Sequence, residues 1–150
     1  MRAFIVILLC FCSTQAFSQY YKNYDWAKKP KLHKLSEKEA SESSVGIIEK
    51  YMIEYVVPEF GNNIKKFETT HTIARVHDEK GIKTHNTVYI SMYDVIDIVD
   101  IKARTITPDG KVTLLNKDNI KEVKNVEEYG DFKIFAIEGA EKDSEIEVLY

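Results

Sequence analysis

Four histidines, His33, His71, His77 and His85, are the first candidates for chemistry, because imidazole is the commonest protein ligand for metals. His71 and His77 would share one face of a strand, but they are six residues apart. In a strand that spacing is ~20 Å, too far for both to bind one metal ion. We therefore predict exposed histidines on hairpins, with no metal site and no cofactor.

Three aspartates, Asp94, Asp97 and Asp100, recur at every third residue and could supply carboxylate oxygens to calcium. They match no calcium loop, because no glycine turn lies among them and no glutamate follows at a fixed offset. On a strand, every third residue alternates between faces, which separates the three carboxylates. The sequence favours solvent-facing charge over a calcium site.

Catalytic patterns are weaker still. A serine hydrolase elbow of the type G-x-S-x-G is absent, and the six glycines occupy turn-like positions with no phosphate-binding loop. The paired carboxylates Glu127–Glu128 and Glu145/Glu147 have the pattern of solvated strand faces. We predict no catalytic residues and no enzymatic activity for this segment by itself.

An aromatic and basic stretch, "YYKNYDWAKKPKLHK" (20–34), offers a candidate ligand platform. Tyr20, Tyr21, Tyr24 and Trp26 carry flat amphipathic rings of the kind that bind sugars or protein partners. The alternative, which we favour, is an extended arm whose rings dock on their own domain or on a neighbouring one.

Targeting is encoded at the N-terminus. Arg2 precedes an apolar run, Ala3 to Cys12, and a polar exit with small residues follows, so we predict a signal peptide over 1–19 with cleavage near Ser18–Gln19. Ten apolar residues are too few to span a bilayer, which needs ~20. The expected location is the periplasm, the cell surface or the extracellular space, with no membrane-spanning segment.

The predicted export signal also excludes cysteine chemistry from the mature segment. Cys10 and Cys12 both lie in the predicted signal peptide, so the mature chain would have no disulfide and no thiol nucleophile. A composition of 44% hydrophobic and 30% charged residues suits one globular domain held by its core. The formal net charge of −3 does not favour nucleic acid as a partner.

The elements follow from periodicity and turn chemistry. Residues 20–44 are predicted as a linker arm that contains a short helix over about 37–42, because Ser36 and Glu39 have capping-box spacing. Residues 45–150 are predicted as the folded domain, rich in Ile, Val, Tyr and Thr, with strands separated by turns at nearly regular spacing. Two of these turns are predicted to be structural: Asp78 to Gly81, with Gly81 in the left-handed position, and Pro108-Asp109-Gly110.

One segment, Tyr93 to Asp100, fits either a helix or a strand. Its β-branched residues favour a strand from about Ile98 to Thr107 that follows a bend over 93–97. The whole pattern predicts an all-β fold, an antiparallel immunoglobulin-like β-sandwich of about seven or eight strands after the short N-terminal helix.

Three segments of the sequence resemble an uncharacterised domain at the front of exported bacterial transglutaminase-like proteins. They are "FETTHTIARVHDEKGIKTHNTVYI", "VDIKARTITPDGKVTLLNKDNIKEV" and "YGDFKIFAIEGAEKDSEIEVLY", and the resemblance covers about 45–150. It implies an immunoglobulin-like sandwich followed by a papain-like catalytic domain with a Cys-His-Asp triad. None of that triad is carried over to this sequence, and we expect the catalytic domain in a longer native chain, beyond Tyr150.

Two functions remain open from these observations. The first is a non-catalytic accessory domain whose partner is a downstream domain of the same polypeptide, and which scaffolds that domain or helps it recognise protein or peptide substrate. The second is a free-standing extracellular module that binds glycan or protein through the aromatic residues of the arm.

Overall fold

The computed structural model describes residues 19–58 and 63–150. The predicted signal peptide therefore lies outside the described residues, except for Gln19. Within them the fold is an all-β sandwich of two antiparallel sheets with few short helices, which confirms the predicted fold class. None of the described helices is long and apolar enough to cross a membrane.

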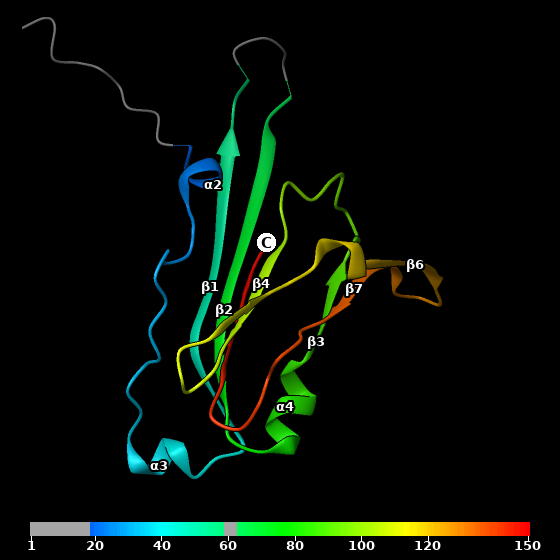
Figure 1. The fold of residues 1–150 in the computed structure, drawn as a ribbon. Helices are drawn as coiled ribbons and strands as arrows, with labels where there is room; N and C mark the ends of the chain where they lie inside the picture. The colour runs from blue at the N-terminus through cyan, green and yellow to red at the C-terminus, as the bar shows by residue number, and fades with distance from the viewer. Residues whose placement is uncertain (1–18, 59–62) are drawn as a thin grey trace, which may run out of the picture.

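One sheet has five strands in the order β1-β2-β8-β4-β5, and the other has three in the order β3-β7-β6 (Figure 1). The strands are β1 (Ser44–Val56), β2 (Lys65–Val76), β3 (Thr87–Ser91), β4 (Lys102–Ile106), β5 (Val112–Leu114), β6 (Lys121–Val126), β7 (Gly130–Ala136) and β8 (Glu145–Leu149). The helices are α2 (Tyr20–Asn23), α3 (Glu37–Ala40), α4 (Glu79–His85) and the 3-10 turn η1 (Lys117–Asn119).

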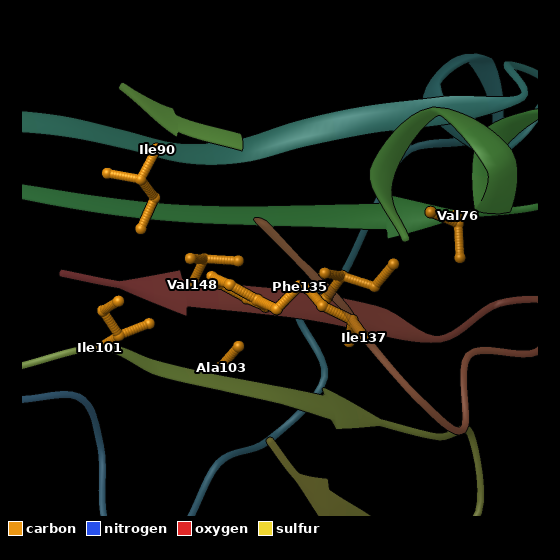
Figure 2. Close-up of a cluster of buried hydrophobic side chains, with 8 residues drawn as sticks. Val76, Ile90, Ile101, Ala103, Phe135, Ile137 and Val148 are labelled. Carbon is orange, nitrogen blue, oxygen red and sulfur yellow. The ribbon is translucent and has the colours of Figure 1, made fainter. Parts of the chain in front are cut away.

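The core lies between the two sheets (Figure 2). Strands β8 and β4 direct alternate residues inward, and strand β7 meets them from the opposite sheet with Phe135, which is 2% exposed. The cluster consists of Val76, Ile90, Ile101, Ala103, Phe135, Ile137, Ile146 and Val148. Since alternate residues of a strand point to opposite faces, the residues between these point away from the core.

The predicted short helix is present as α3. Ser36 is its N-cap: the Ser36 side chain accepts from the Glu39 amide, and the Glu39 carboxylate accepts from the Ser36 amide at 2.8 Å. The helix is shorter than predicted and ends at Ala40. Strand β1 begins at Ser44, the last residue of the predicted arm.

The predicted hairpin turn at Asp78–Gly81 is wrong. Asp78 is instead the N-cap of α4, where its side chain accepts a hydrogen bond from the Gly81 amide at 2.8 Å. Gly81 is buried in the first turn of this helix, and its role is close approach, because a Cβ there would lie 2.0 Å from the Ser43 carbonyl oxygen. The sequence Asp-Glu-Lys-Gly fits both a turn and a capped helix start, and in the helix the close approach of Ser43 requires glycine.

The second turn lies between β4 and β5 and contains Pro108, Asp109 and Gly110. The Gly110 amide donates to the Thr107 carbonyl at 2.8 Å, and Gly110 has a φ of +85°. The Asp109 carboxylate accepts from the Thr107 hydroxyl and from the Lys111 amide. Proline, aspartate and glycine thus serve the backbone geometry of this turn.

The ambiguous segment before β4 forms neither a helix nor a strand. Residues 92–100 are bends and turns, and β4 begins at Lys102 rather than near Ile98, so the predicted strand start is wrong. Asp94 has a φ of 57°, a left-handed conformation that interrupts both a helix and a strand. The Asp97 and Asp100 side chains accept from the amides that follow them, which also competes with regular structure.

Candidate functional site

The outer face of the five-stranded sheet, which points away from the three-stranded sheet, carries charged side chains under the arm. The register places Arg104 opposite Glu147 and Arg75 opposite Glu145, on adjacent strands. Glu145 is only 1% exposed and Glu147 3% exposed. The prediction that these two glutamates are solvated is therefore wrong, because β8 is the central strand and the arm crosses above it.

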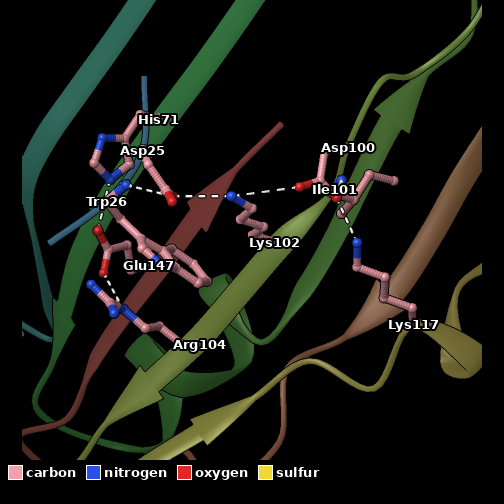
Figure 3. Close-up of polar contacts among 9 residues, drawn as sticks. All are labelled: Asp25, Trp26, His71, Asp100, Ile101, Lys102, Arg104, Lys117 and Glu147. Atoms are coloured by element: carbon pink, nitrogen blue, oxygen red, sulfur yellow. Dashed lines mark hydrogen bonds and ion pairs between the residues drawn. The ribbon is translucent and has the colours of Figure 1, made fainter. Parts of the chain in front are cut away.

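One cluster on this face joins three strands to the arm (Figure 3). The Glu147 carboxylate contacts the Arg104 Nε at 2.5 Å and the His71 Nε2 at 2.8 Å. On the other side of its ring, the His71 Nδ1 lies 2.6 Å from the Tyr24 hydroxyl. The Arg104 guanidinium lies 4.2 Å from the centre of the Trp26 ring. The prediction that His71 is exposed is wrong, since strand parity directs it into this buried cluster.

A second cluster holds the next part of the arm. The Glu145 carboxylate accepts from the His33 amide at 2.7 Å and contacts the His33 Nδ1 at 2.9 Å. Arg75 donates to the same carboxylate at 2.6 Å and to the His33 carbonyl at 2.8 Å. Backbone and side chain of one arm residue are thereby fixed to two neighbouring strands.

Charges at the margin of the arm continue the network toward solvent. Lys102 contacts Asp25 at 3.0 Å and Asp100 at 3.6 Å, and Lys117 contacts Asp100 at 2.5 Å (Figure 3). Burial alone would raise the pKa of Asp25, but the hydrogen bond from Lys102 and the nearby positive charges hold it below its ordinary value. Ion pairs as exposed as these typically stabilise a fold by at most about 1 kcal/mol each.

The electrostatics of the first cluster favour an ionised Glu147. Burial would raise the pKa of its carboxyl group, but hydrogen bonds from His71 and Arg104, together with their charges, lower it below the ordinary value. Both ring nitrogens of His71 are already hydrogen-bonded, and the carboxylate is shared with Arg104. These hydrogen bonds link Tyr24 of the arm to Glu147 through His71 and thereby anchor the arm to the sheet.

The structure brings the residues of the predicted aromatic platform onto this same face. Tyr21 stacks on Phe67 of β2 with ring centroids 3.6 Å apart, and the Tyr21 amide donates to Glu54 of β1. Tyr24 and Trp26 contact His71 and Arg104, as described above. Tyr20, in contrast, is exposed and stacks on Tyr24. Three of the four rings are thus engaged by the protein's own sheet.

His77 and His85 are half-buried, so the prediction that they are exposed on hairpins is also wrong, and each lies in a separate pair. The His77 Nδ1 contacts Asp143 at 2.7 Å, and the His85 Nε2 contacts the Ser44 hydroxyl at 3.1 Å. Burial lowers the pKa of His85. Within 19–58 and 63–150, no group of three His, Cys, Asp or Glu side chains could hold a metal ion.

A second exposed surface is apolar and lies on the outer face of the three-stranded sheet. Pairing places Tyr89 beside Ile134 and Phe132 beside Val123, all on the face opposite the core residue Phe135. Tyr89 is 64% exposed, Val123 is exposed, and the other two are half-buried. This surface was not predicted, although the run "FKIFAI" is apolar on both faces of a strand.

The charged clusters were also overlooked, and here the alternation was visible. His71 and Arg75 have the same strand parity, Lys102 and Arg104 flank Ala103, and Glu145 and Glu147 flank Ile146. Acidic and basic strands of matching period can pair side chains across a sheet. Only the strand order, with acidic β8 between basic β2 and β4, shows that they do so here.

Comparison with known proteins gives little. No protein-family model matches this sequence, and no curated protein gives a significant match. Among solved structures, the chain is similar to one described as a putative protease from Parabacteroides distasonis ATCC 8503, with 12% identity and a TM-score of 0.46 over 56% of this chain. The match spans 18% of that protein's chain. At this level the likeness assigns neither a family nor an activity.

Proposed function

We propose that this β-sandwich is a non-catalytic accessory domain of an exported transglutaminase-like protein. In that role it scaffolds a catalytic domain of the same polypeptide, or helps that domain select protein or peptide substrate. The sequence resemblance over 45–150 motivates the proposal. The observation that supports it best is the apolar outer face of the three-stranded sheet.

That face has the character of a surface that another domain covers. Strand β7 places Phe135 in the core and its neighbours Phe132 and Ile134 on the outside, so the strand is apolar on both faces. Strands of this kind are normally buried on both sides. Tyr89 adds a large exposed ring next to Ile134. A neighbouring domain packed here would remove this apolar area from water.

The alternative, a free-standing module that binds glycan or protein through the arm, has less support. It needs the aromatic faces of the platform to be available to a ligand. The rings of Tyr21 and Trp26 instead lie against Phe67 and Arg104. Ligand binding that disappears in Trp26→Ala, while the domain remains folded, would favour this alternative.

The first experiment is the intact mass of the native protein recovered from its source cells, with both terminal peptides sequenced. A mass well above 17.4 kDa, with a cysteine and a histidine in the additional part, supports the accessory role. A mature chain that starts near Gln19 and stops at Tyr150 would contradict it, because no catalytic domain would remain to be assisted.

A second experiment tests the packing surface in the intact protein by calorimetry. If a following domain covers the three-stranded sheet, Ile134→Lys uncouples the unfolding of the two domains and separates their transitions. Leu114→Lys is the matched control, because Leu114 is an exposed apolar residue at the far edge of the other sheet. Equal effects of the two variants would show that the face is not an interdomain contact.

A further inference from the structure

Strand β1 leaves one edge of the five-stranded sheet open. It is the first strand in the sheet order and pairs only with β2. Within the described part of the chain, no backbone hydrogen bond reaches its other edge. The arm does not supply one, because it contacts β1 through side chains: the Tyr21 amide donates to the Glu54 carboxylate at 3.0 Å, and the Lys50 ammonium lies 5.6 Å from the centre of the Tyr24 ring. A long open edge is a template for pairing with another strand.

The side chains of β1 beyond the sandwich are unusually apolar for an open edge. Tyr51, Ile53 and Tyr55 share one face and are 59%, 48% and 67% exposed. In Figure 1 the β1–β2 hairpin extends past the level of the three-stranded sheet. A strand paired with this edge would place its own side chains beside Tyr51, Ile53 and Tyr55 on the same face and cover part of their apolar surface.

Strand β1 carries opposite charges at equal distances from Met52. Lys50 lies two residues before Met52 and Glu54 two residues after it, while Tyr51 and Ile53 are the immediate neighbours of Met52. Two copies paired antiparallel about Met52 would place Lys50 opposite Glu54 of the second copy. The two-fold symmetry forms this pair twice. The same register places Tyr51 opposite Ile53 of the second copy, on the exposed apolar face.

Other registers lose this complementarity. In a symmetric dimer, the two β1 strands present the same face to the same side of the joined sheet only if the two-fold axis is perpendicular to the sheet and passes through a residue. The registers to compare are therefore those centred on a residue. Centring on Tyr51 places Lys50 opposite Met52, and centring on Ile53 places it opposite Val56. The register centred on Met52 therefore satisfies both charges, whereas its neighbours leave them against apolar side chains.

The ends of the pairing segment are also defined. The β1–β2 register shifts between Gly46 and Ile48, where the bulge bends the strand. Beyond Val56, Pro58 removes a backbone donor and cannot continue a ladder. The regular segment between these two features is centred on Met52.

We propose that two copies of this chain associate by antiparallel pairing of their β1 strands about Met52, which joins their five-stranded sheets into one continuous sheet. The occupant of the open edge is a second copy because the edge is complementary to itself in charge and in apolar pairing. This inference does not depend on the proposed accessory function.

A cysteine scan of the full mature chain tests the register directly. Cys10 and Cys12 both lie in the predicted signal peptide, so the thiol introduced into β1 would be the only thiol within residues 19–150. Met52→Cys places two thiols opposite each other, at a Cα separation that suits a disulfide, and we expect a covalent dimer under mild oxidation. Tyr55→Cys is the control, because the two copies of residue 55 would be ~20 Å apart. Equal crosslinking of both variants, or of neither, would overturn the proposal.

Charge reversal tests the same pairing without crosslinking, by sedimentation equilibrium of the full mature chain. We expect wild type to dimerise, Lys50→Glu to raise the dimer dissociation constant about tenfold, and the double variant Lys50→Glu/Glu54→Lys to restore it. Lys111→Glu, at an exposed turn far from β1, makes the same charge change and should have no effect. A monomeric wild type would refute the dimer, and a double variant as weak as the single would refute the register. A 1:1 complex with an unrelated extended peptide at this edge, in place of a dimer, would also refute it.

Discussion

Gly81→Ala should destabilise the protein, although alanine in a helix normally stabilises it. Gly81 lies in the first turn of α4, where alanine gains about 1 kcal/mol over glycine from helix propensity. Here the added Cβ would lie 2.0 Å from the Ser43 carbonyl oxygen and 2.9 Å from its carbon. The Ser43 backbone therefore has to move.

The displacement has a cost because Ser43 is held in place. Its carbonyl accepts from the His77 amide at 2.9 Å, and its hydroxyl donates to Asp78 at 2.8 Å. Overpacking costs about 1–3 kcal/mol, and a lost hydrogen bond costs about 1 kcal/mol more. After subtracting the gain in helix propensity, we expect a net loss of about 2 kcal/mol. For a domain of this size, that loss lowers the melting temperature by roughly 8 °C.

The assay is thermal unfolding by circular dichroism at one fixed protein concentration, with Gly46→Ala as the matched control. Gly46 has no atom within 4 Å of an added Cβ and its φ is not positive, so this variant should melt at or slightly above wild type. Gly81→Asn distinguishes the close approach from a left-handed turn. Asparagine tolerates a left-handed backbone, but it meets Ser43 as alanine does. Gly81→Ala melting at or above wild type would refute this reasoning.

Three further predictions follow from the turn and from the first buried cluster. Gly110→Val should cost about 1 kcal/mol or more, because a β-branched residue resists a φ of +85°, and Gly110→Asn should cost less; urea titrations of both variants measure this. The pKa of Glu147 is lower in the folded protein than its ordinary value of 4.5. Its contribution to the free energy of unfolding is therefore complete above pH 4.5 and declines as the pH falls toward the pKa of the folded state. Glu147→Gln should therefore flatten the loss of unfolding free energy in that acid range, and identical pH slopes for variant and wild type would contradict it. Arg104→Ala should shift the emission of Trp26, the only tryptophan, to longer wavelength, and Arg104→Lys should not restore it, because lysine has no planar group to stack.

The features that the sequence predicted correctly are those encoded within a few residues. The capping box of Ser36 and Glu39 needs only a spacing of three residues, and α3 begins there. The strands and their turns were visible as alternation and glycine or proline positions, which is enough for the fold class. Strand boundaries were less certain, since residues 92–100 contain β-branched side chains but adopt bends.

The features that were missed depend on contacts between distant segments. Glu145 and Glu147 look solvated because charged residues in a strand usually face water, and only their place between two basic strands and under the arm makes them buried. Gly81 was assigned to a turn because the sequence around it does not reveal its contact with Ser43. Ser43 lies far from Gly81 in the sequence, and its carbonyl leaves no room for a Cβ at residue 81. Local patterns cannot distinguish a glycine required by its φ from a glycine required by a neighbour.

The buried charges explain why the arm occupies a single position on the sheet. Replacing a buried ion pair by apolar residues often leaves a protein as stable or more so, and therefore stability alone does not explain these clusters. Apolar arm residues could settle at several positions along a sheet, whereas Glu145 accepts both from the His33 amide and from Arg75 in a single geometry. Stacking of Trp26 on Arg104 adds a second fixed point. The charges thus select one register for the arm on the outer face of the sheet.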